Sequence, residues 1–522
     1  MPVLTTSLDP GSPSYADNLT AMLDRLAELE SALHQARAGG GDKYVTRHHA
    51  RGKLLARERI ELLVDRDAPF LELSPVAAWG TEYPVGASAV TGIGAVEGVP
   101  CVIIANDPTV RDGTVNPYTL RKTQRAGDIA RANRLPVIHL VESGGADLAA
   151  QLDLFVPGGA ALCDLSRRSA EGIGSVAVIF GDATGGGAVA AGLADTTILV
   201  RDSAKLTLAG PPLVRLATGE EIDDEALGGA FMHATRSGLA DHVAEDERDA
   251  IRLARLSIAR KNRSTVRGPA TFPEPPKYDP DDLLAVRSAD PDTPSDPREV
   301  LGRVLDGSDF DEFKPAYGTG LCTGWGAIHG YQVGILANAA GVLGLAEATK
   351  AAHFIALANA CRTPLLFVQD TTGYAVGGEA ERSGIIAQAA RMVTAVANSR
   401  VPHLTLNIGG SYGIGNYGMC GRAFEPRFLF SWPNARSALL GADQVAEVLS
   451  GDGRRAADAQ GLPYDADTDT AMRRAVERIE QESAALVMSG RLYDDGIIDP
   501  RDTRTVLGLC LAVVGPAAPT QQ

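Results

Sequence analysis

The sequence predicts a layered α/β protein in which one domain fold occurs twice. Short apolar runs such as "CVIIAN", "PVIHLVES" and "SVAVIFGD" alternate with helical patterns between Arg59 and Ala250. Continuous apolar runs bounded by Gly and Asp are typical of strands that are buried on both faces of a sheet. The 57 glycines lie among these runs, where such a fold needs tight strand-to-helix turns. The same alternation returns after residue 297, which indicates a duplication.

Length and composition narrow the classes of function. A chain of 522 residues exceeds one ordinary domain, so we expect two or three. The formal charge of -16 argues against a nucleic-acid partner. The six cysteines form no CxxC pair, so neither a zinc site nor a disulfide framework is expected. The N-terminus lacks a signal sequence, and the run "TVLGLCLAVVG" is too short to span a bilayer. We therefore expect a soluble, cytoplasmic protein without a metal ion or a membrane contact.

Three segments precede or separate the two predicted domains. Residues 14–38 are predicted to form an amphipathic helix, because apolar side chains recur there at helical spacing. These side chains are Leu19, Met22, Leu26 and Leu29. The stretch "RHHARGKLLARERI" follows and carries five Lys or Arg residues from Arg47 to Arg59. Residues 267–297 contain eight prolines and many acids, which is typical of an extended connector. We therefore predict an N-terminal domain at 1–272 and a C-terminal domain at 273–522.

Two pairs of windows align between the halves without a gap. "TGIGAVEGVPCVIIAN" (91–106) aligns on "TGWGAIHGYQVGILAN" (323–338). "RLPVIHLVESGGA" (134–146) aligns on "RTPLLFVQDTTGY" (362–374), with Arg, Pro, an acid and a glycine in register. Any two α/β segments can resemble each other by chance, which would explain one aligned pair. Chance explains two aligned pairs in the same order much less well. We infer that the two domains arose by internal duplication.

Each half contains a glycine-rich turn. The second pair of windows aligns Arg134 on Arg362, and the same offset places "GDATGGGAVAAG" (181–192) over the segment that begins "GGSYGIGNYG" (409–418). Each turn follows an apolar run and precedes a predicted helix, so its backbone N–H groups can point at a single oxygen atom. Two such donors form an oxyanion hole, whereas an ordinary tight turn is the alternative for either stretch alone. The duplication favours the oxyanion holes.

Two familiar motifs occur in the second turn and are set aside. "GIGNYG" matches GxGxxG, but no helix and second strand with a ribose-binding acid follow it, as a dinucleotide fold requires. "GGSYG" matches GxSxG with Ser411 as nucleophile, but that fold needs a later histidine and none follows His403. The chain also lacks a Walker A sequence and an HExxH pattern. Two oxyanion holes without a side-chain base make chemical sense if the base arrives with a cofactor.

Long stretches of the chain resemble the carboxyltransferase β subunit of biotin-dependent acyl-CoA carboxylases. They include "ARGKLLARERIELLVD", "AGPPLVRLATGEEIDDEALGGAFMHATRSGLADH" and "DDGIIDPRDTR". The run "GNYGMCGRAFEPRF" is most similar to the methylcrotonoyl-CoA carboxylase branch. The resemblance implies two crotonase-like domains and a homo-hexamer, a trimer of dimers. It also implies an α subunit that carries biotin and uses ATP, and an active site between the N domain of one protomer and the C domain of another.

The resemblance also implies a role for each turn. The N–H groups of Gly186 and Gly187 would bind the thioester oxygen of the acyl-CoA as the enolate develops. The N–H groups of Ile414 and Gly415 would stabilise charge on the ureido oxygen of biotin as carbon dioxide leaves carboxybiotin. The deprotonated biotin nitrogen would then act as the base, so no protein base is needed.

Cations and two further segments are expected to bind CoA. The basic stretch offers Arg51, Lys53, Arg57 and also Arg59, although a solvated helix face would explain these residues equally well. Segments that match the family's acyl-CoA regions contain Gly144, Gly145, Ala146 and Lys350. We expect His353, beside that lysine, to lie on a helix face rather than to act in catalysis.

Several positions depart from the methylcrotonoyl-CoA branch. Ile414 replaces a usual alanine, Val189 replaces a bulky aromatic residue, and Ala387 replaces a usual lysine. Residues 155–173 form a shorter stretch without the branch's aromatic side chains. These departures fall near the expected acyl pocket, so the acyl group itself stays open.

Three other interpretations remain beside the carboxyltransferase. They are a decarboxylase of the glutaconyl-CoA type, a degenerate β subunit that scaffolds an assembly, and a crotonase hydratase or isomerase. The last of these needs a pair of glutamates near the first turn, where the loop supplies only Asp182.

Overall fold

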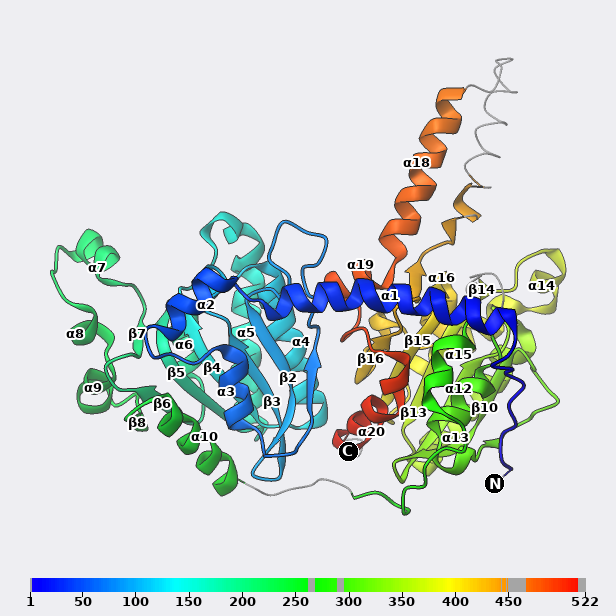
Figure 1. Ribbon diagram of the computed structural model, residues 1–522, viewed down its shortest axis with the longest axis horizontal. Helices are drawn as coiled ribbons and strands as arrows, with labels where there is room; N and C mark the ends of the chain where they lie inside the picture. Colours follow the sequence, from blue (N-terminus) through cyan, green and yellow to red (C-terminus); the bar gives the residue numbers. More distant parts are fainter. Residues whose placement is uncertain are drawn as a thin grey trace. The chain divides into compact units, whose positions relative to one another are not determined.

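The computed structural model describes residues 2–261, 268–288, 295–442, 444–446, 448 and 466–514. Its contacts divide the chain into two compact units, each with its own mixed sheet (Figure 1). Unit 1 comprises Met1–Glu30, Gly268–Ser489 and Tyr493–Gln522, and unit 2 comprises Ser31–Arg267 and Gly490–Leu492. The long helix α1 (Pro13–Arg37) confirms the predicted N-terminal helix. The domain boundary after residue 272 stays a prediction.

The sheet of unit 2 has the order β1-β2-β3-β4-β5-β6-β8, and β7 pairs with the end of β5. Its strands are β1 (Phe70–Leu73), β2 (Ala89–Val96), β3 (Val99–Asn106), β4 (Val137–Ser143), β5 (Ser175–Thr184), β6 (Thr197–Val200), β7 (Lys205–Thr207) and β8 (His242–Ala244). Its main helices are α2 (Asp42–His49), α3 (Ala56–Leu63), α4 (Pro117–Asn133), α5 (Gln151–Ala170), α6 (Gly186–Gly192), α7 (Pro211–Thr218) and α10 (Glu247–Lys261). The strands from β3 to β6 run parallel.

Apolar side chains cover both faces of this sheet. Ile60 of α3 and Ile251 of α10 pack against strand residues such as Val178. The alternate residues of the same strand, such as Ile179, pack with Ala188 of α6. The strands are therefore buried on both faces, as their continuous apolar runs predict.

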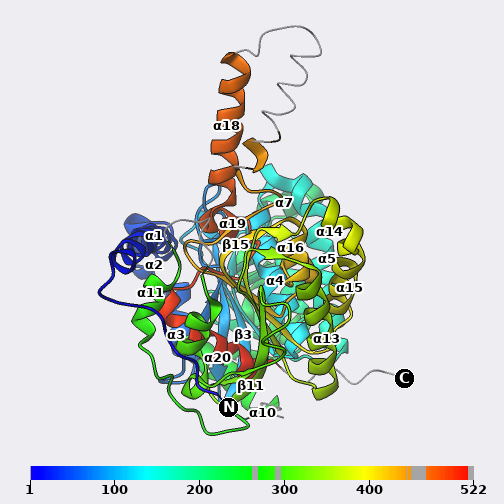
Figure 2. The same cartoon turned by 90° about the vertical axis from the view of Figure 1, so that its right-hand side faces the viewer.

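Unit 1 repeats this arrangement with a sheet of order β16-β15-β13-β11-β10-β9, in which β17 pairs with the end of β15. Helices α13 and α15 of this unit lie side by side (Figure 2). Its strands are β9 (Asp311–Glu312), β10 (Leu321–Ile328), β11 (Tyr331–Asn338), β13 (Leu365–Thr371), β15 (His403–Tyr412), β16 (Phe428–Ser431) and β17 (Arg436–Ala438), with the separate pair β12 (Val342–Leu343) and β14 (Gly373–Tyr374). Its main helices are α11 (Leu283–Val286), α12 (Pro297–Val304), α13 (Leu345–Cys361), α14 (Gly378–Ser383), α15 (Ile385–Ala397), α16 (Gly413–Gly418), α18 (Ala466–Ser483), α19 (Ala485–Gly490) and α20 (Thr503–Val513).

Local backbone features recur at the predicted offset and confirm the duplication. The register shifts between Val141 and Ser143 in unit 2, and between Gln369 and Thr371 in unit 1. Helices α4 and α13 end at the two arginines that the second pair of windows aligns, and both are left-handed: Arg134 has φ 54° and Arg362 has φ 52°. Such details are set by neighbouring strands and helices rather than by chance, so the two units share one fold.

The prediction of an extended connector over 267–297 is wrong in one part. Within it, Leu283–Val286 forms the short helix α11, and all four residues are buried in unit 1. The apolar run "LLAV" explains this, because burying it against the unit outweighs the extended preference of the flanking prolines. Residues 267 and 289–294 of that segment lie outside the described residues.

Candidate active site

The two glycine-rich turns occupy equivalent places at the carboxyl ends of strands. Strand β5 pairs first with β6 and then, through Asp182–Thr184, with β7 before the chain turns at Gly185 (φ 61°) into α6. Strand β15 pairs first with β16 and then with β17 before the turn at Gly413 (φ 52°) into α16. A positive φ favours glycine at both turns.

The predicted donors lie in the first turns of these two helices. Gly186 and Gly187 begin α6, while Ile414 and Gly415 follow the first residue of α16. The N–H groups of a first helical turn have no acceptor within their own helix, so they are free to meet an external oxygen.

The two turns differ in the space around them. A Cβ atom placed on Gly186 or Gly187 would meet nothing within 4 Å. A Cβ atom on Gly415 would lie 2.9 Å from Cα of Gly373 and 3.0 Å from Oγ1 of Thr371. Ile414 is 60% exposed. The first turn is therefore open, whereas the second is packed on the side of Gly415 and open at Ile414.

The predicted CoA-binding glycines lie beside the first turn. The N–H of Gly144 donates to the carbonyl of Asp112 at 2.9 Å, and the carbonyl of Gly145 accepts from Val115 N–H at 2.8 Å. A Cβ atom on Gly145 (φ 99°) would lie 3.8 Å from the carbonyl oxygen of Thr184. This turn, with Ala146, thus borders the residue that precedes the first glycine turn. Gly373, which aligns with Gly145, instead lies directly against Gly415 of the second turn.

Two of the predicted cations share one buried carboxylate. The ammonium of Lys53 forms an ion pair with Glu142. Arg59, which is 0% exposed, donates from Nη2 to Glu142 and to Glu247, both at 2.7 Å. Its guanidinium carbon lies 4.1 Å from the centre of the Phe180 ring. Burial by itself raises the pKa of Glu142, but Arg59 and Lys53 outweigh it and hold that pKa below its usual value.

The other predicted CoA contacts lie in different surroundings. Arg57 donates to both oxygens of Glu72, at 2.6 and 2.9 Å, whereas Arg51 is exposed. Lys350 is buried, and its ammonium donates to the carbonyl of Leu321 at 2.8 Å. His353 lies on α13 outside the buried set, as predicted. A contact between Lys350 and CoA would require that the ammonium leave its internal acceptors, and all the CoA contacts stay predictions.

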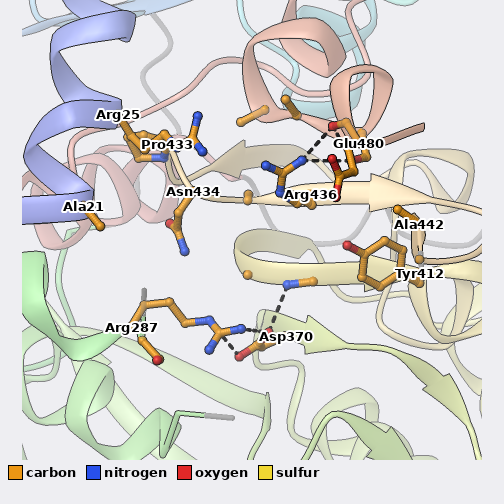
Figure 3. Close-up of a pocket in the computed structure, with 18 of the residues that line it drawn as sticks. Ala21, Arg25, Arg287, Asp370, Tyr412, Pro433, Asn434, Arg436, Ala442 and Glu480 are labelled. Carbon is orange, nitrogen blue, oxygen red and sulfur yellow. Dashed lines mark hydrogen bonds and ion pairs between the residues drawn. The ribbon is translucent and has the colours of Figure 1, made fainter. Parts of the chain in front are cut away.

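A cavity of about 370 Å³ lies at the carboxyl ends of β13 and β15 in unit 1 (Figure 3). Thr372 and Tyr412, which directly precede Gly373 and Gly413, line it. Asp370 faces Arg287 across 3.3 Å and accepts the N–H of Gly410 at 2.9 Å. Burial raises the pKa of Asp370, although both partners lower it. The charged side chains that line the cavity are Arg25, Arg287, Arg436, Asp370 and Glu480.

Sequence reasoning missed that Glu142 and Asp370 form ion pairs with buried arginines. Both are the acid that aligns in the second pair of windows, so a signal was present in the sequence. Ser411 is 1% exposed, and its hydroxyl donates to Gln369 at 2.6 Å. It is therefore inaccessible as the nucleophile that the GxSxG match suggests. Among the described residues, no group of three or more His, Cys, Asp or Glu side chains could hold a metal ion.

Known proteins resemble this chain over nearly its whole length. A family described as "Carboxyl transferase domain" matches residues 47–517. The probable biotin-dependent acyl-coenzyme A carboxylase beta2 subunit of Mycobacterium tuberculosis is 57% identical over 98% of this chain and 97% of its own length. The biotin-dependent 3-methylcrotonyl-coenzyme A carboxylase beta1 subunit of the same organism is 44% identical, with 98% of each chain covered. The crystal structure of the geranyl-CoA carboxylase beta subunit from P. aeruginosa superposes with a TM-score of 0.91 at 39% identity, over 99% of this chain and 97% of that one.

Proposed function

The chain belongs to the carboxyltransferase β subunits of biotin-dependent acyl-CoA carboxylases, which have two crotonase-like domains, and from this premise we propose that its two glycine turns are the two oxyanion holes of the transfer. The observation that carries the proposal is the equivalence of the turns. Each turn places the main-chain N–H groups of a first helical turn at the carboxyl end of a strand. The two strands, β5 in unit 2 and β15 in unit 1, are equivalent. Main-chain donors aimed at developing negative charge are often the largest single term in such catalysis.

The first turn is the proposed site of the acyl-CoA. The N–H groups of Gly186 and Gly187 would bind the thioester oxygen and stabilise the enolate, while the open space around both glycines leaves room for the thioester. Carboxybiotin on the partner supplies the carboxyl group and, once carbon dioxide has left, the base. The N–H groups of Ile414 and Gly415 would donate to the ureido oxygen. The exposed surface at Ile414 fits a group that arrives from outside the unit.

The acyl group is proposed to be apolar and to differ in shape from methylcrotonoyl. Val189 and Leu208 are exposed apolar side chains near the first turn. Leu208 is close because a Cβ atom on Gly185 would lie 3.8 Å from its carbonyl oxygen. Gly158 and Gly159 of α5 have nothing within 4 Å of an added Cβ atom, which is consistent with a roomy surface where the methylcrotonoyl branch has aromatics. Two of the relatives are named for 3-methylcrotonyl-coenzyme A and geranyl-CoA, whose acyl groups are both apolar but differ in length.

We also propose that the chain works as an oligomer with a biotin-carrying α subunit. The helical segment Leu148–Ala170 is long and apolar enough to span a membrane, yet only 11% of its apolar 18-residue stretch is buried. An exposed apolar surface of this kind on a protein of this family favours contact with another subunit. The proposed hexamer predicts at least a dimer at micromolar concentration by light scattering, and a monomer would remove the basis for a shared active site.

Co-expression with a biotinylated α subunit tests the function directly. The complex should co-purify and should carboxylate one or more members of a panel of acetyl-, propionyl-, methylcrotonoyl- and geranyl-CoA when ATP and bicarbonate are present. Decarboxylation of a carboxylated acyl-CoA without carboxylation of any member would favour the glutaconyl-CoA type. A stable complex without either activity would favour the scaffolding subunit.

A further inference from the structure

Three side chains beneath the second glycine turn form a chain of hydrogen bonds, here called the relay. Asn416 Nδ2 donates to Ser411 Oγ at 2.7 Å, and Ser411 Oγ donates to Gln369 Oε1 at 2.6 Å. Gln369 Nε2 then donates to the main-chain carbonyl of Met419 at 2.7 Å. Gln369 and Ser411 are each 1% exposed, so water does not compete for these bonds.

The last acceptor fixes the direction of every bond in the relay. A main-chain carbonyl can only accept, so Gln369 must present its amide N–H to Met419 and its oxygen to Ser411. The hydroxyl of Ser411 therefore donates to Gln369 and accepts from the amide of Asn416. Each side chain has one orientation that satisfies the whole relay.

The relay ties α16 to the sheet at both of its ends. Ser411 is the residue of β15 two positions before Gly413, and Met419 is the C-cap residue that directly follows α16. Asn416 lies within the helix, and Gln369 belongs to the neighbouring strand β13. A rotation or shift of α16 against β13 would lengthen or bend at least one of these bonds. Hydrogen bonds weaken steeply when they are bent, so the relay resists such a movement.

Unit 2 has apolar residues at the positions that match the relay. The offset that aligns Arg134 on Arg362 also pairs each relay residue, and the acceptor Met419, with an apolar residue of unit 2. In the order Gln369, Ser411, Asn416 and Met419, these residues are Val141, Ala183, Ala188 and Ala191. They belong to, or pack against, one apolar cluster. In unit 2 the carbonyl of Ala191 accepts instead from Thr197 Oγ1, at 3.3 Å. The fold therefore forms such a turn without the relay, and a restraint by three linked polar side chains is particular to the second turn.

We infer that Gln369, Ser411 and Asn416 are positioning residues, which orient α16 so that the N–H groups of Ile414 and Gly415 converge on one oxygen atom. Apolar packing fixes the distance between a helix and a sheet, whereas directional bonds also fix the rotation of the helix about its own axis. The inference rests on the proposed role of the second turn as an oxyanion hole. Its geometric part, the restraint of α16, can be measured without any catalytic assay.

Ser411→Ala tests the inference in the complex with the α subunit, because it removes the central hydroxyl. Hydrogen exchange should accelerate at the amides of Gly413–Gly418 and stay unchanged at Gly186–Gly192, the matched turn in the same chain. The value of kcat should fall about 10- to 100-fold, the range that a small misplacement of catalytic donors causes. KM for the acyl-CoA should change little, because that substrate is assigned to the first turn.

A second variant separates positioning from simple loss of stability. The triple change Gln369→Val, Ser411→Ala and Asn416→Ala copies the apolar solution of unit 2 and leaves none of the three relay side chains unpaired. It should regain thermal stability relative to Ser411→Ala without regaining kcat. Full recovery of kcat, or unchanged exchange at Gly413–Gly418 in Ser411→Ala, would overturn the inference. A wild-type complex that carboxylates no acyl-CoA would instead contradict the proposed function. The hydrogen-exchange result would then still test whether the relay restrains α16.

Discussion

Lys122 and Lys350 make the same two hydrogen bonds at equivalent places in the two units. The ammonium of Lys122 donates to the carbonyls of Ala89 at 2.7 Å and Gly86 at 3.2 Å. That of Lys350 donates to the carbonyls of Leu321 at 2.8 Å and Gly318 at 3.4 Å. The lysines align at the offset of the second pair of windows, and both pairs of acceptors align at the offset of the first. Each lysine thereby fastens a helix to the start of the second strand of its unit, β2 or β10.

The first prediction concerns the pH dependence of stability at Lys122. Burial lowers the pKa of Lys122 to about 8, below its value in the unfolded chain. Between pH 8 and about 10.4 the unfolded state therefore binds more protons than the native state, so the free energy of unfolding rises with pH, by up to about 1.4 kcal/mol per pH unit. Lys122→Met should lose this rise. Thermal unfolding of both proteins from pH 7.5 to 10 measures it, and parallel curves would contradict the assignment.

The second prediction compares two glycines of the turns. Gly415→Ala must displace backbone, because its Cβ atom would lie 2.9 Å from Cα of Gly373. We expect a lower melting temperature and loss of carboxylation. Gly187→Ala enters open space and should leave the melting temperature unchanged. If its N–H group binds the thioester, the added methyl group should still raise KM for the acyl-CoA. Equal melting temperatures for the two variants would show that the second turn is not closely packed.

The third prediction concerns the buried carboxylate of Glu142. Glu142→Gln leaves Lys53 and Arg59 without part of their counter-charge, and breaking such a buried pair typically costs about 3–5 kcal/mol of stability. Because the folded pKa of Glu142 lies below its usual value, this contribution is present at neutral pH and is lost as the pH falls below ~4.3.

Glu72→Gln is the matched control for this prediction, since it breaks the more exposed pair with Arg57. That change should cost at most about 1 kcal/mol. Chemical denaturation at pH 7 and pH 4 measures both variants. A Glu142→Gln variant that is as stable as Glu72→Gln would show that the buried network contributes little.

The fourth prediction concerns acyl selectivity at Ile414. Its main-chain N–H does not depend on the side chain, but the side chain is exposed and larger than the alanine usual in the methylcrotonoyl branch. Ile414→Ala should therefore change the ratio of kcat/KM between short branched and longer acyl-CoAs, by roughly 10- to 200-fold for ~1–3 kcal/mol of contact energy. The assay needs the biotin partner. An unchanged ratio would make Ile414 a packing residue and move the question to residues 155–173 and Val189.

The sequence predicted the fold through patterns that repeat. Strands that are buried on both faces are recognisable because they consist of continuous apolar runs. The duplication helped, since the same pattern of strands occurs in both halves of the sequence. The role of the acid at the end of a strand was harder to predict. Glu142 is held by Lys53 and Arg59, which come from a distant segment. The basic stretch suggested a surface for CoA, yet Arg59 is buried. Arg59 shares the helical face of the buried Ala56, Ile60 and Leu63, so its burial had a local signal, whereas its two acidic partners come from distant segments.

Because the proposed donors are main-chain groups, no single substitution can delete their N–H groups except a change to proline. Side chains around the turns can therefore vary while the chemistry persists. In this chain, Ile414 stands at a proposed donor position, where the methylcrotonoyl-CoA branch is expected to have alanine. Point mutations around the turns could therefore change the preferred acyl group while the enzyme stays active. With main-chain donors, the backbone shape would set the reaction, and the residues that surround the turns would set the choice of substrate.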